Sequence, residues 1–197
     1  MKLCLFSGTF NPIHNAHLRM ADFVLKDFGF DKILFIPAFV PPHKSVGNVA
    51  SCNRLEMVKL AVKPYEYFQV SDVEFRLNGV SYTYLTILEL QKELGTNENF
   101  SLIIGTDAFE KIETWYEIDK LKKMVRFIVS KRHDDVDLTR FDHLRDKGFD
   151  FVFTSLDFCD ISSTEIRENV AEGKPISDLV PREVEDYIYD NGLYRKD

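Results

Sequence analysis

The stretch CLFSGTFNPIHNAHLRMADFVL, residues 4–25, decides the fold, because an apolar run passes through a Ser-Gly-Thr turn directly into an amphipathic segment. Apolar residues in and just after this segment recur at the i, i+3, i+4 and i+7 spacing of one helical face: Ala21, Val24, Leu25 and Phe28. Two histidines, His14 and His17, stand at the start of the predicted helix. A strand that leads straight into a helix packed on it is typical of an α/β protein.

The same order of elements recurs along the chain. Apolar, β-rich runs occupy residues 2–7, 32–37, 68–75, 100–105, 125–130 and 149–155. Each is followed by a segment that can be read as helical, most clearly residues 52–62, 81–94 and 181–192. This alternation predicts a single α/β domain over residues 1–197, built on a mostly parallel sheet. Ligands bind beyond the carboxyl ends of the strands in such sheets, so the residues after each strand are the candidate site.

The composition argues against several classes of protein. The 197 residues carry a net charge of -7, and no basic stripe is present that could follow a nucleic-acid backbone. The longest apolar run, residues 33–40, is interrupted by Pro37 and is far shorter than the ~20 residues of a membrane helix. The three cysteines, Cys4, Cys52 and Cys159, have the spacing of neither a disulfide framework nor a zinc site. We expect a cytoplasmic protein that binds neither nucleic acid nor a membrane.

The turn after the first strand has the features of an anion site. Gly8 lets the backbone of Thr9 and Phe10 approach a phosphate, and the N-terminus of the following helix favours negative charge. His14 and His17 lie three residues apart on one helical face, where both could donate hydrogen bonds to phosphate oxygens. The alternative is that one histidine caps the helix and the other lies on the surface. A metal site is disfavoured because no third ligand stands nearby.

Further candidates follow the second and fourth strands. Two prolines stiffen the loop that presents His43 and Lys44, and a lysine there suits a phosphate, although a solvated lysine is the alternative. Gly105 permits close approach, and Asp107 could accept hydrogen bonds from ribose hydroxyls or could instead be a helix N-cap. Trp115, the only tryptophan, could stack on a flat ring or serve as packing.

A second anion site is predicted at ISSTEIR, residues 161–167. The hydroxyls of Ser162 and Ser163 open a helix, and the Arg167 guanidinium projects near its start. The alternative is a plain capping sequence in which Ser162 and Glu165 form the S-x-x-E pattern. Both interpretations can hold together.

These motifs resemble a known family. SGTFNPIHNAH, residues 7–17, resembles the (H/T)xGH signature of the nucleotidylyltransferase superfamily, and ISSTEIR resembles its second phosphate motif. The segments PPHK, SYTYLTILEL, IIGTDAFEKIETWYE and LVPREVEDYIYDNGLY are similar in order and spacing to bacterial nicotinate-mononucleotide adenylyltransferase. Two departures are Ala16, where the family usually has Gly, and Asn11, where it usually has Asp. The resemblance covers nearly the whole chain and implies a doubly wound, Rossmann-like nucleotidylyltransferase fold with a small C-terminal helical part.

The resemblance also implies a reaction and its site residues. AMP would pass from ATP to nicotinate mononucleotide, giving deamido-NAD and pyrophosphate in NAD biosynthesis, with Mg2+ bridging the phosphates. The residues implied in catalysis are His14, His17, Lys44 and Arg167. Those implied in ATP binding also include Gly8, Thr9, Phe10, Gly105, Asp107, Arg132, Ile161, Ser162 and Ser163. Those implied in acceptor binding are Thr9, Phe10, Lys44, Tyr82, Thr83 and Trp115. No protein metal ligand is implied, and a homo-oligomer is possible.

Three alternatives stay open. Phosphopantetheine adenylyltransferase shares the first and last phosphate motifs but lacks segments of the TDAFEKIETWYE and YIYDNGLY type. A nicotinamide-preferring adenylyltransferase would differ only in how it treats the pyridine carboxylate. A nucleotide-binding regulator without turnover would result if the extra methyl group of Ala16 displaced ATP.

Overall fold

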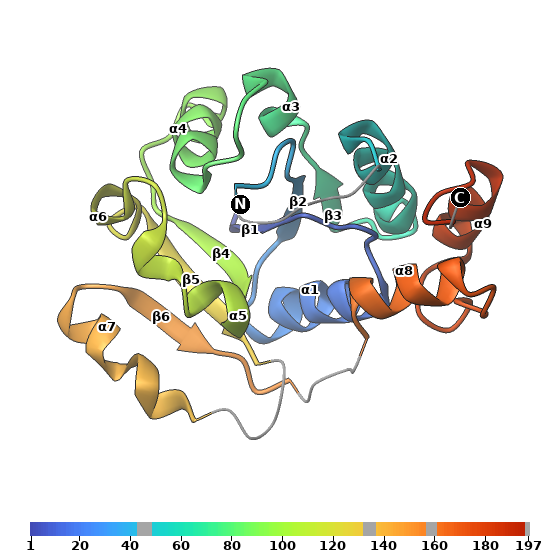
Figure 1. The fold of residues 1–197 in the computed structure, drawn as a ribbon. Coiled ribbons are helices and arrows are strands. Elements are labelled where there is room, and N and C mark those ends of the chain that lie inside the picture. The colour runs from blue at the N-terminus through green and yellow to red at the C-terminus, as the bar shows by residue number, and fades with distance from the viewer. Residues whose placement is uncertain (43–48, 132–136, 157–160, 196–197) are drawn as a thin grey trace.

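The fold is built on one sheet of six parallel strands (Figure 1). The computed structural model describes residues 1–42, 49–131, 137–156 and 161–195. In spatial order the strands are β3 (Phe68–Val70), β2 (Lys32–Pro37), β1 (Leu3–Gly8), β4 (Phe100–Gly105), β5 (Val125–Ser130) and β6 (Asp150–Phe153). The order β3-β2-β1-β4-β5-β6 shows that the chain winds outward from β1 in one direction and then returns to wind in the other. The predicted doubly wound, Rossmann-like fold is confirmed.

The direction of winding reverses between β1 and β4. Phe6 of β1 aligns with Phe35 of β2 on one side and with Ile103 of β4 on the other. Loops that leave β1 and β4 run to different sides of the sheet, so a crevice opens at their carboxyl ends. This is the place where the candidate site is expected.

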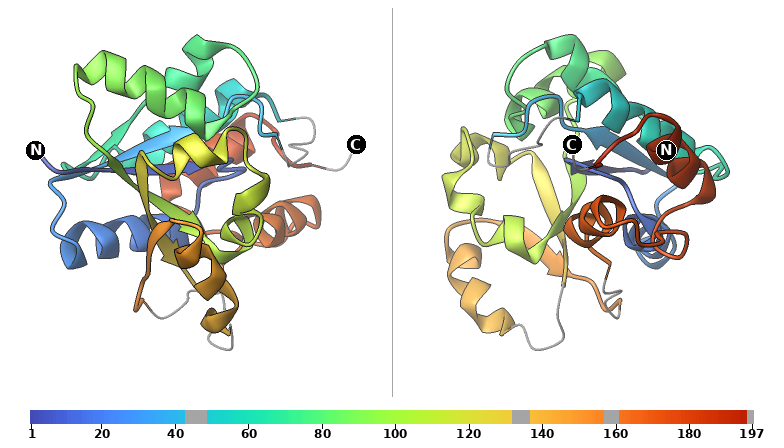
Figure 2. Two further views of the ribbon diagram at one scale, coloured as in Figure 1. Left: turned by 90° about the vertical axis from the view of Figure 1, so that its left-hand side faces the viewer. Right: turned by 45° about the vertical axis from the view of Figure 1, so that its right-hand side comes forward.

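Helices cover both faces of the sheet, as Figures 1 and 2 show from three directions. The helices are α1 (Asn15–Asp27), α2 (Ser51–Val62), α3 (Val73–Leu77), α4 (Thr83–Leu94), α5 (Thr106–Phe109), α6 (Ile118–Leu121), α7 (Asp142–Asp146), α8 (Ser163–Ala171) and α9 (Arg182–Asp190), with short 3-10 turns η1 (Ile112–Thr114) and η2 (Leu138–Phe141). Within the described residues, none of the helices has the length and apolar character that crossing a membrane requires.

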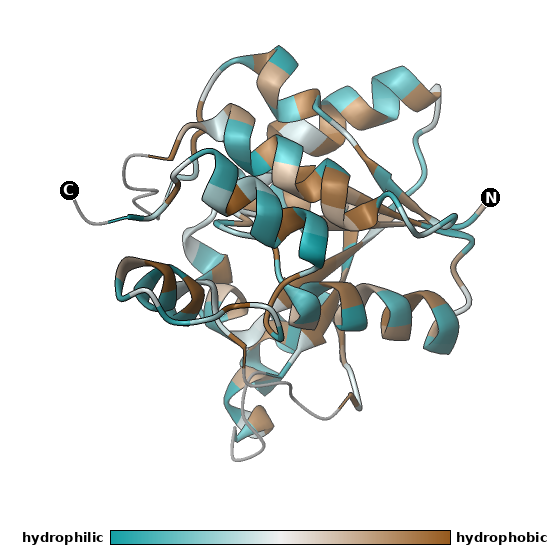
Figure 3. Cartoon of the chain, turned by 90° about the vertical axis from the view of Figure 1, so that its right-hand side faces the viewer, coloured by the Kyte–Doolittle hydropathy of each residue, from teal (hydrophilic) through white to brown (hydrophobic). Residues whose placement is uncertain are grey.

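Alternate residues of each strand supply the two halves of the core. Cys4 and Phe6 of β1 join one cluster with buried side chains of α1, α2, α8 and α9, whereas Leu5 joins another with side chains of α3 to α7. This alternation follows from the period of two along a strand that is covered on both faces. Figure 3 shows the consequence, with hydrophobic strands inside and hydrophilic outer faces on the helices.

The first helix confirms the predicted apolar face. Ala21, Val24 and Leu25 are buried under the sheet, and Phe28 packs against the same cluster from the C-cap position. The predicted C-terminal helix is also present as α9, with Val184 and Ile188 fully buried.

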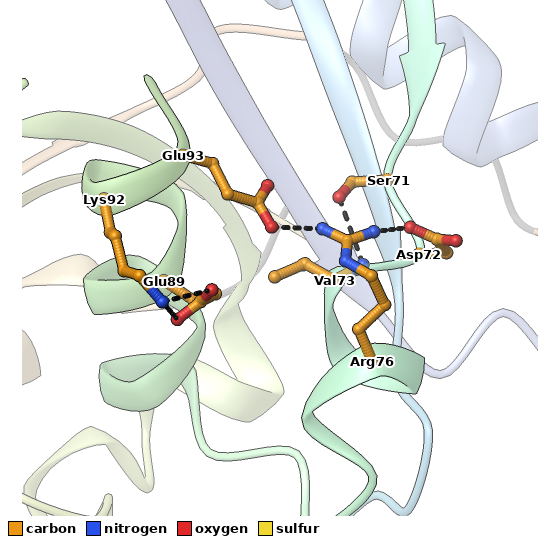
Figure 4. A network of polar contacts seen from close by, with 7 residues as sticks. All are labelled: Ser71, Asp72, Val73, Arg76, Glu89, Lys92 and Glu93. Atoms are coloured by element: carbon orange, nitrogen blue, oxygen red, sulfur yellow. Dashed lines mark hydrogen bonds and ion pairs between the residues drawn. The ribbon is translucent and has the colours of Figure 1, made fainter. Parts of the chain in front are cut away.

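The predicted third strand, residues 68–75, is wrong beyond Val70. The Val73 N–H donates to Ser71 Oγ at 3.2 Å, and this local bond turns the chain into α3. Arg76 then pairs with Asp72 on its own helix and with Glu93 on α4, which fixes α3 against α4 (Figure 4). Alternating apolar and polar residues in this short segment therefore marked a three-residue strand and a helix start rather than one long strand.

Candidate active site

One cavity of about 710 Å³ lies at the carboxyl ends of β1 and β4. Its walls come from the turn after β1, the loop after β2, the start of α4, the segment from Gly105 to Tyr116, and the start of α8. Such a volume lies in the range of small-molecule sites, about 300–1,000 Å³. Every predicted site residue among the described residues lines this cavity. Lys44 and Arg132, predicted to bind phosphate, lie outside the described residues.

The turn after β1 is shaped by close packing of Phe10 on Gly8. Phe10 adopts a φ of 47°, and its buried ring lies so close that a Cβ added to Gly8 would meet Phe10 Cζ at 2.9 Å. The ring also contacts Phe6 and His17, with centroids 5.5 and 5.1 Å away. Gly8 is therefore required for this internal approach as well as for any approach of a phosphate, and Phe10 has only backbone atoms to offer a ligand.

The two histidines form a stacked pair at the start of α1. Their ring centroids lie 3.6 Å apart with 29° between the planes, and the His14 backbone N–H lies 3.3 Å from His17 Nδ1. His14 occupies the N-cap position and is buried, and His17 is half-buried at the third helical position. The capping alternative therefore holds in part, because the pair forms a capping box. The alternative of a surface histidine is wrong for both residues.

The second phosphate motif is attached directly to the first. Ser163 Oγ donates to the Pro12 carbonyl at 2.9 Å, and Arg167 Nη1 donates to the Asn11 carbonyl at 2.9 Å. Ser162 caps α8, since its Oγ accepts the Glu165 N–H at 3.1 Å. The capping interpretation of ISSTEIR is thus confirmed, and the same residues line the cavity. Two motifs separated by about 150 residues in sequence form one continuous wall.

The C-terminus also reaches this turn. The Tyr194 hydroxyl donates to Asn11 Oδ1 at 2.8 Å. Burial raises the pKa of the Tyr194 phenol above its usual value, which keeps the hydroxyl protonated and able to donate. In the sequence, Tyr194 is the last residue of LVPREVEDYIYDNGLY, a segment that supports only the family resemblance. No local sequence pattern connects Tyr194 with Asn11.

The opposite wall is aromatic. Tyr82 is the N-cap residue of α4 and Thr83 begins that helix, and both residues line the cavity, so the positive end of this helix lies at the wall. The Tyr82 ring stacks on the Tyr116 ring with centroids 4.6 Å apart. Trp115 is half-buried, packs against the core and lines the cavity, so its packing and ligand-facing interpretations are compatible.

Two predictions about the segment after β4 have different outcomes. Gly105 is the N-cap of α5, so the alternative that Asp107 caps this helix is wrong. Asp107 instead lies exposed in the first turn and lines the cavity. Lining residues that sequence reasoning missed include Arg19, Glu74, Ser81 and Lys111. Arg19, on α1, has no sequence signal that separates it from an ordinary surface arginine.

The polar and aromatic residues of the cavity suit an anionic ligand that also carries flat rings. No group of three or more His, Cys, Asp or Glu side chains among the described residues could hold a metal ion. Helix starts, hydroxyls and the Arg167 guanidinium supply hydrogen-bond donors to its lining, and Tyr82, Trp115 and Tyr116 supply flat aromatic rings. A ligand with both phosphates and aromatic rings fits this division.

Comparison with known proteins identifies first the class and then the family of this protein. A model described as cytidylyltransferase-like matches residues 5–169, which defines the class of the fold and site. The chain is 37% identical to nicotinate-nucleotide adenylyltransferase of Bacillus subtilis, with 98% of both chains covered. It is 38% identical to a probable nicotinate-nucleotide adenylyltransferase of Syntrophotalea carbinolica, with 99% of this chain and 98% of that one covered. The chain therefore belongs to the nicotinate-nucleotide adenylyltransferase family.

A solved structure agrees at the level of fold. Plasmodium falciparum nicotinic acid mononucleotide adenylyltransferase, solved in complex with NaAD, superposes with a TM-score of 0.77. The two chains are 23% identical, and the match covers 98% of this chain and 97% of that one. At this identity the likeness extends to the fold alone. It supports the predicted nucleotidylyltransferase fold independently of the sequence motifs.

Proposed function

We propose that this protein transfers AMP from ATP to nicotinate mononucleotide, giving deamido-NAD and pyrophosphate. The observation that carries the proposal is the attachment of the ISSTEIR motif to the turn after β1, since Ser163 and Arg167 both donate to carbonyls of that turn. This attachment brings two predicted phosphate motifs together in the lining of a cavity that Trp115 also lines. Family membership supports the same reaction.

The reaction needs positioning and charge stabilisation rather than an enzyme nucleophile. An oxygen of the acceptor's 5'-phosphate attacks the α-phosphorus of ATP, and the bond from that phosphorus to the β-bridging oxygen breaks. The bonding electrons leave with pyrophosphate, so negative charge grows on the β and γ phosphates. Donors fixed beside that charge lower the barrier, because they need no reorganisation during the reaction.

We assign the phosphate end to the two histidines and to the start of α8. His14 and His17 are held in a stack, and His17 Nδ1 accepts the His14 N–H, so the Nε2 atoms of the two rings would serve the triphosphate. Arg167 is anchored through the Asn11 carbonyl and Thr164 Oγ1, and its remaining N–H groups would donate to the leaving pyrophosphate. Ser162, Ser163 and Ile161 would contribute backbone N–H groups or hydroxyls, and Lys44 and Arg132 would add charge.

We assign the remaining wall to the sugars and rings. Gly105 and Asp107 would hold the adenosine ribose, because a carboxylate accepts hydrogen bonds from both of its hydroxyls. Gly8, Thr9 and Phe10 would contact phosphate and acceptor through their backbone. Trp115 would stack on the pyridine ring, while Tyr82 and Thr83 at the start of α4 would face its carboxylate.

Nucleotidyltransferases generally use a divalent metal ion with ATP, and we propose Mg2+ for this protein. Bound to the phosphates, Mg2+ would neutralise charge on the leaving pyrophosphate while keeping most of its waters. Asp107 is the exposed carboxylate of the cavity that could reach such a water. The protein's own task is then to orient the triphosphate.

One experiment tests the proposal against its alternatives. The protein is incubated with ATP, Mg2+ and nicotinate mononucleotide, nicotinamide mononucleotide or phosphopantetheine, and the product is identified by mass. We expect deamido-NAD to form fastest. Dephospho-coenzyme A, a preference for nicotinamide mononucleotide, or nucleotide binding without any product would each support the corresponding alternative.

Three broader predictions remain proposals. We propose that residues 1–197 fold as a single domain, that the protein acts in the cytoplasm, and that it can form a homo-oligomer. Limited proteolysis, fractionation of cells that express the protein, and light scattering would test them in turn.

A further inference from the structure

Arg54 is an arginine buried at the centre of the molecule. It lies on α2 with 0% of its surface exposed. Nη1 donates to the Thr9 carbonyl at 2.8 Å and to the Ala38 carbonyl at 2.6 Å, and Nη2 donates to the Phe39 carbonyl at 2.9 Å. Thr9 directly follows β1, and Ala38 and Phe39 directly follow β2. One guanidinium therefore joins the exits of the two neighbouring strands.

The same loop is held from its other side by Glu74 of α3. The Phe39 N–H lies 2.8 Å from Ser81 Oγ and 3.3 Å from Glu74 Oε2, and Thr86 Oγ1 donates to Glu74 Oε1 at 2.9 Å. Glu74 is only 2% exposed and lines the cavity. Ser81 precedes Tyr82 and Thr83, the residues assigned to the acceptor. Phe39 is thus bonded through its carbonyl to Arg54 of α2, and through its N–H to Glu74 of α3 and to Ser81, which precedes α4.

Burying these two charged groups carries a free-energy cost that an apolar core would not have. Burial lowers the pKa of Arg54 and raises that of Glu74, which reflects the cost of keeping each group charged away from water. Apolar side chains of similar volume would fill the same space without that cost. Apolar side chains cannot hold three carbonyls at fixed relative positions, as the planar fork of Arg54 does, and they cannot accept the Phe39 N–H, as Glu74 does.

We propose that Arg54 and Glu74 are positioning residues, which set the triphosphate-binding turn after β1 at a fixed distance from the acceptor pocket through Phe39. Neither residue is assigned to the phosphates or the pyridine ring. The inference rests on the proposed function, because it supposes that two substrates must be aligned. In-line attack is sensitive to such alignment, since a displacement of about 1 Å can cost on the order of 10²-fold in rate.

The first test is Arg54→Lys, which keeps the charge but loses the fork. A single ammonium nitrogen cannot reproduce bonds made by two guanidinium nitrogens to carbonyls on two loops. We expect kcat to fall roughly 10- to 100-fold, while the dissociation constants of ATP and of nicotinate mononucleotide, measured separately by calorimetry, change less than about threefold. Weakened binding that accounts for the whole loss would overturn the inference, as would an unchanged kcat.

The matched control is Val58→Ala on the same helix. Val58 is fully buried and takes no part in the polar contacts, so this change lowers stability without releasing the two loops. We expect Val58→Ala to melt earlier and to keep its kcat per folded molecule. Equal loss of kcat in Val58→Ala would show that general loosening, and not positioning, explains the Arg54 result.

Glu74 gives an independent second test, which also decides the matter if Arg54→Lys fails to fold. Glu74→Ala should lower kcat about tenfold or more. Glu74→Gln should recover most of it, because an amide oxygen can still accept the Phe39 N–H. Equal losses in the two variants would refute the inference. Wild-type protein that makes no deamido-NAD would instead refute the proposed function, so the two failures are distinguishable.

Discussion

Replacing His17 separates its structural role from its chemical role. In His17→Ala the His14 N–H loses its acceptor, Nδ1 at 3.3 Å, and the half-buried ring leaves its contacts with Phe6 and Phe10. Because this hydrogen bond is long, its loss should lower the free energy of unfolding by about 0.5–1 kcal/mol. For a domain of this size, 1 kcal/mol corresponds to a fall in Tm of about 2–4 °C. The structure therefore predicts a small but measurable loss of stability for His17→Ala.

The loss of activity should be much larger than the loss of stability. Removing one donor that acts on developing charge costs about 10²–10³ in kcat. The informative comparison is His17→Gln, because glutamine at the third helical position completes a capping box but cannot place a donor where the imidazole does. We expect His17→Gln to recover Tm while kcat stays low. The assay is pyrophosphate release at saturating substrates, corrected for the folded fraction. A glutamine variant that recovers kcat together with Tm would show that His17 acts only through the helix.

Three further predictions concern other walls of the cavity. Arg167→Ala should raise the KM of ATP more than that of the acceptor at fixed ionic strength, and an increase confined to the acceptor would contradict the assignment. Trp115→Ala should reduce kcat/KM for nicotinate and nicotinamide mononucleotides alike. Thr83→Val should reduce kcat/KM for nicotinate mononucleotide more than for nicotinamide mononucleotide, and equal reductions would exclude a role of Thr83 in discriminating between them. Tyr194→Phe should destabilise the fold by ~1 kcal/mol in urea unfolding, because the buried bond to Asn11 is lost; unchanged stability would show that this bond is dispensable.

The fold was predictable because its signals are local and repeated. Parallel strands buried on both faces read as apolar runs, and five of the predicted runs correspond closely to strands of the sheet. The one clear error is residues 71–75, where the Ser71 hydroxyl accepts the Val73 N–H and so competes with the hydrogen bonds between strands. That competition depends on a hydroxyl and one backbone N–H, which periodicity does not register.

The candidate site was predictable for those residues that the sheet topology brings to one edge. Gly8, Gly105 and Tyr82 reach one cavity because they end strands or begin helices at the same edge of the sheet. Tyr194 and Glu74 were missed for the opposite reason, since the residues that connect them to the site, Asn11 and Phe39, are more than 30 residues away and neither Tyr194 nor Glu74 stands at a strand end. Nothing in a single sequence distinguishes a buried Glu from the many exposed ones.

The stacked histidines show why the structural and chemical interpretations of a motif need not compete. A ring that moved freely would have to be ordered in every catalytic cycle, and that ordering would add to the barrier. The capping bond between His14 and His17, together with the edge contacts to Phe10, provides this order during folding. The contacts that stabilise the start of α1 would therefore also order the two rings for the proposed reaction. The same reasoning applies to Ser162, whose hydroxyl caps α8 at the wall where phosphate is expected.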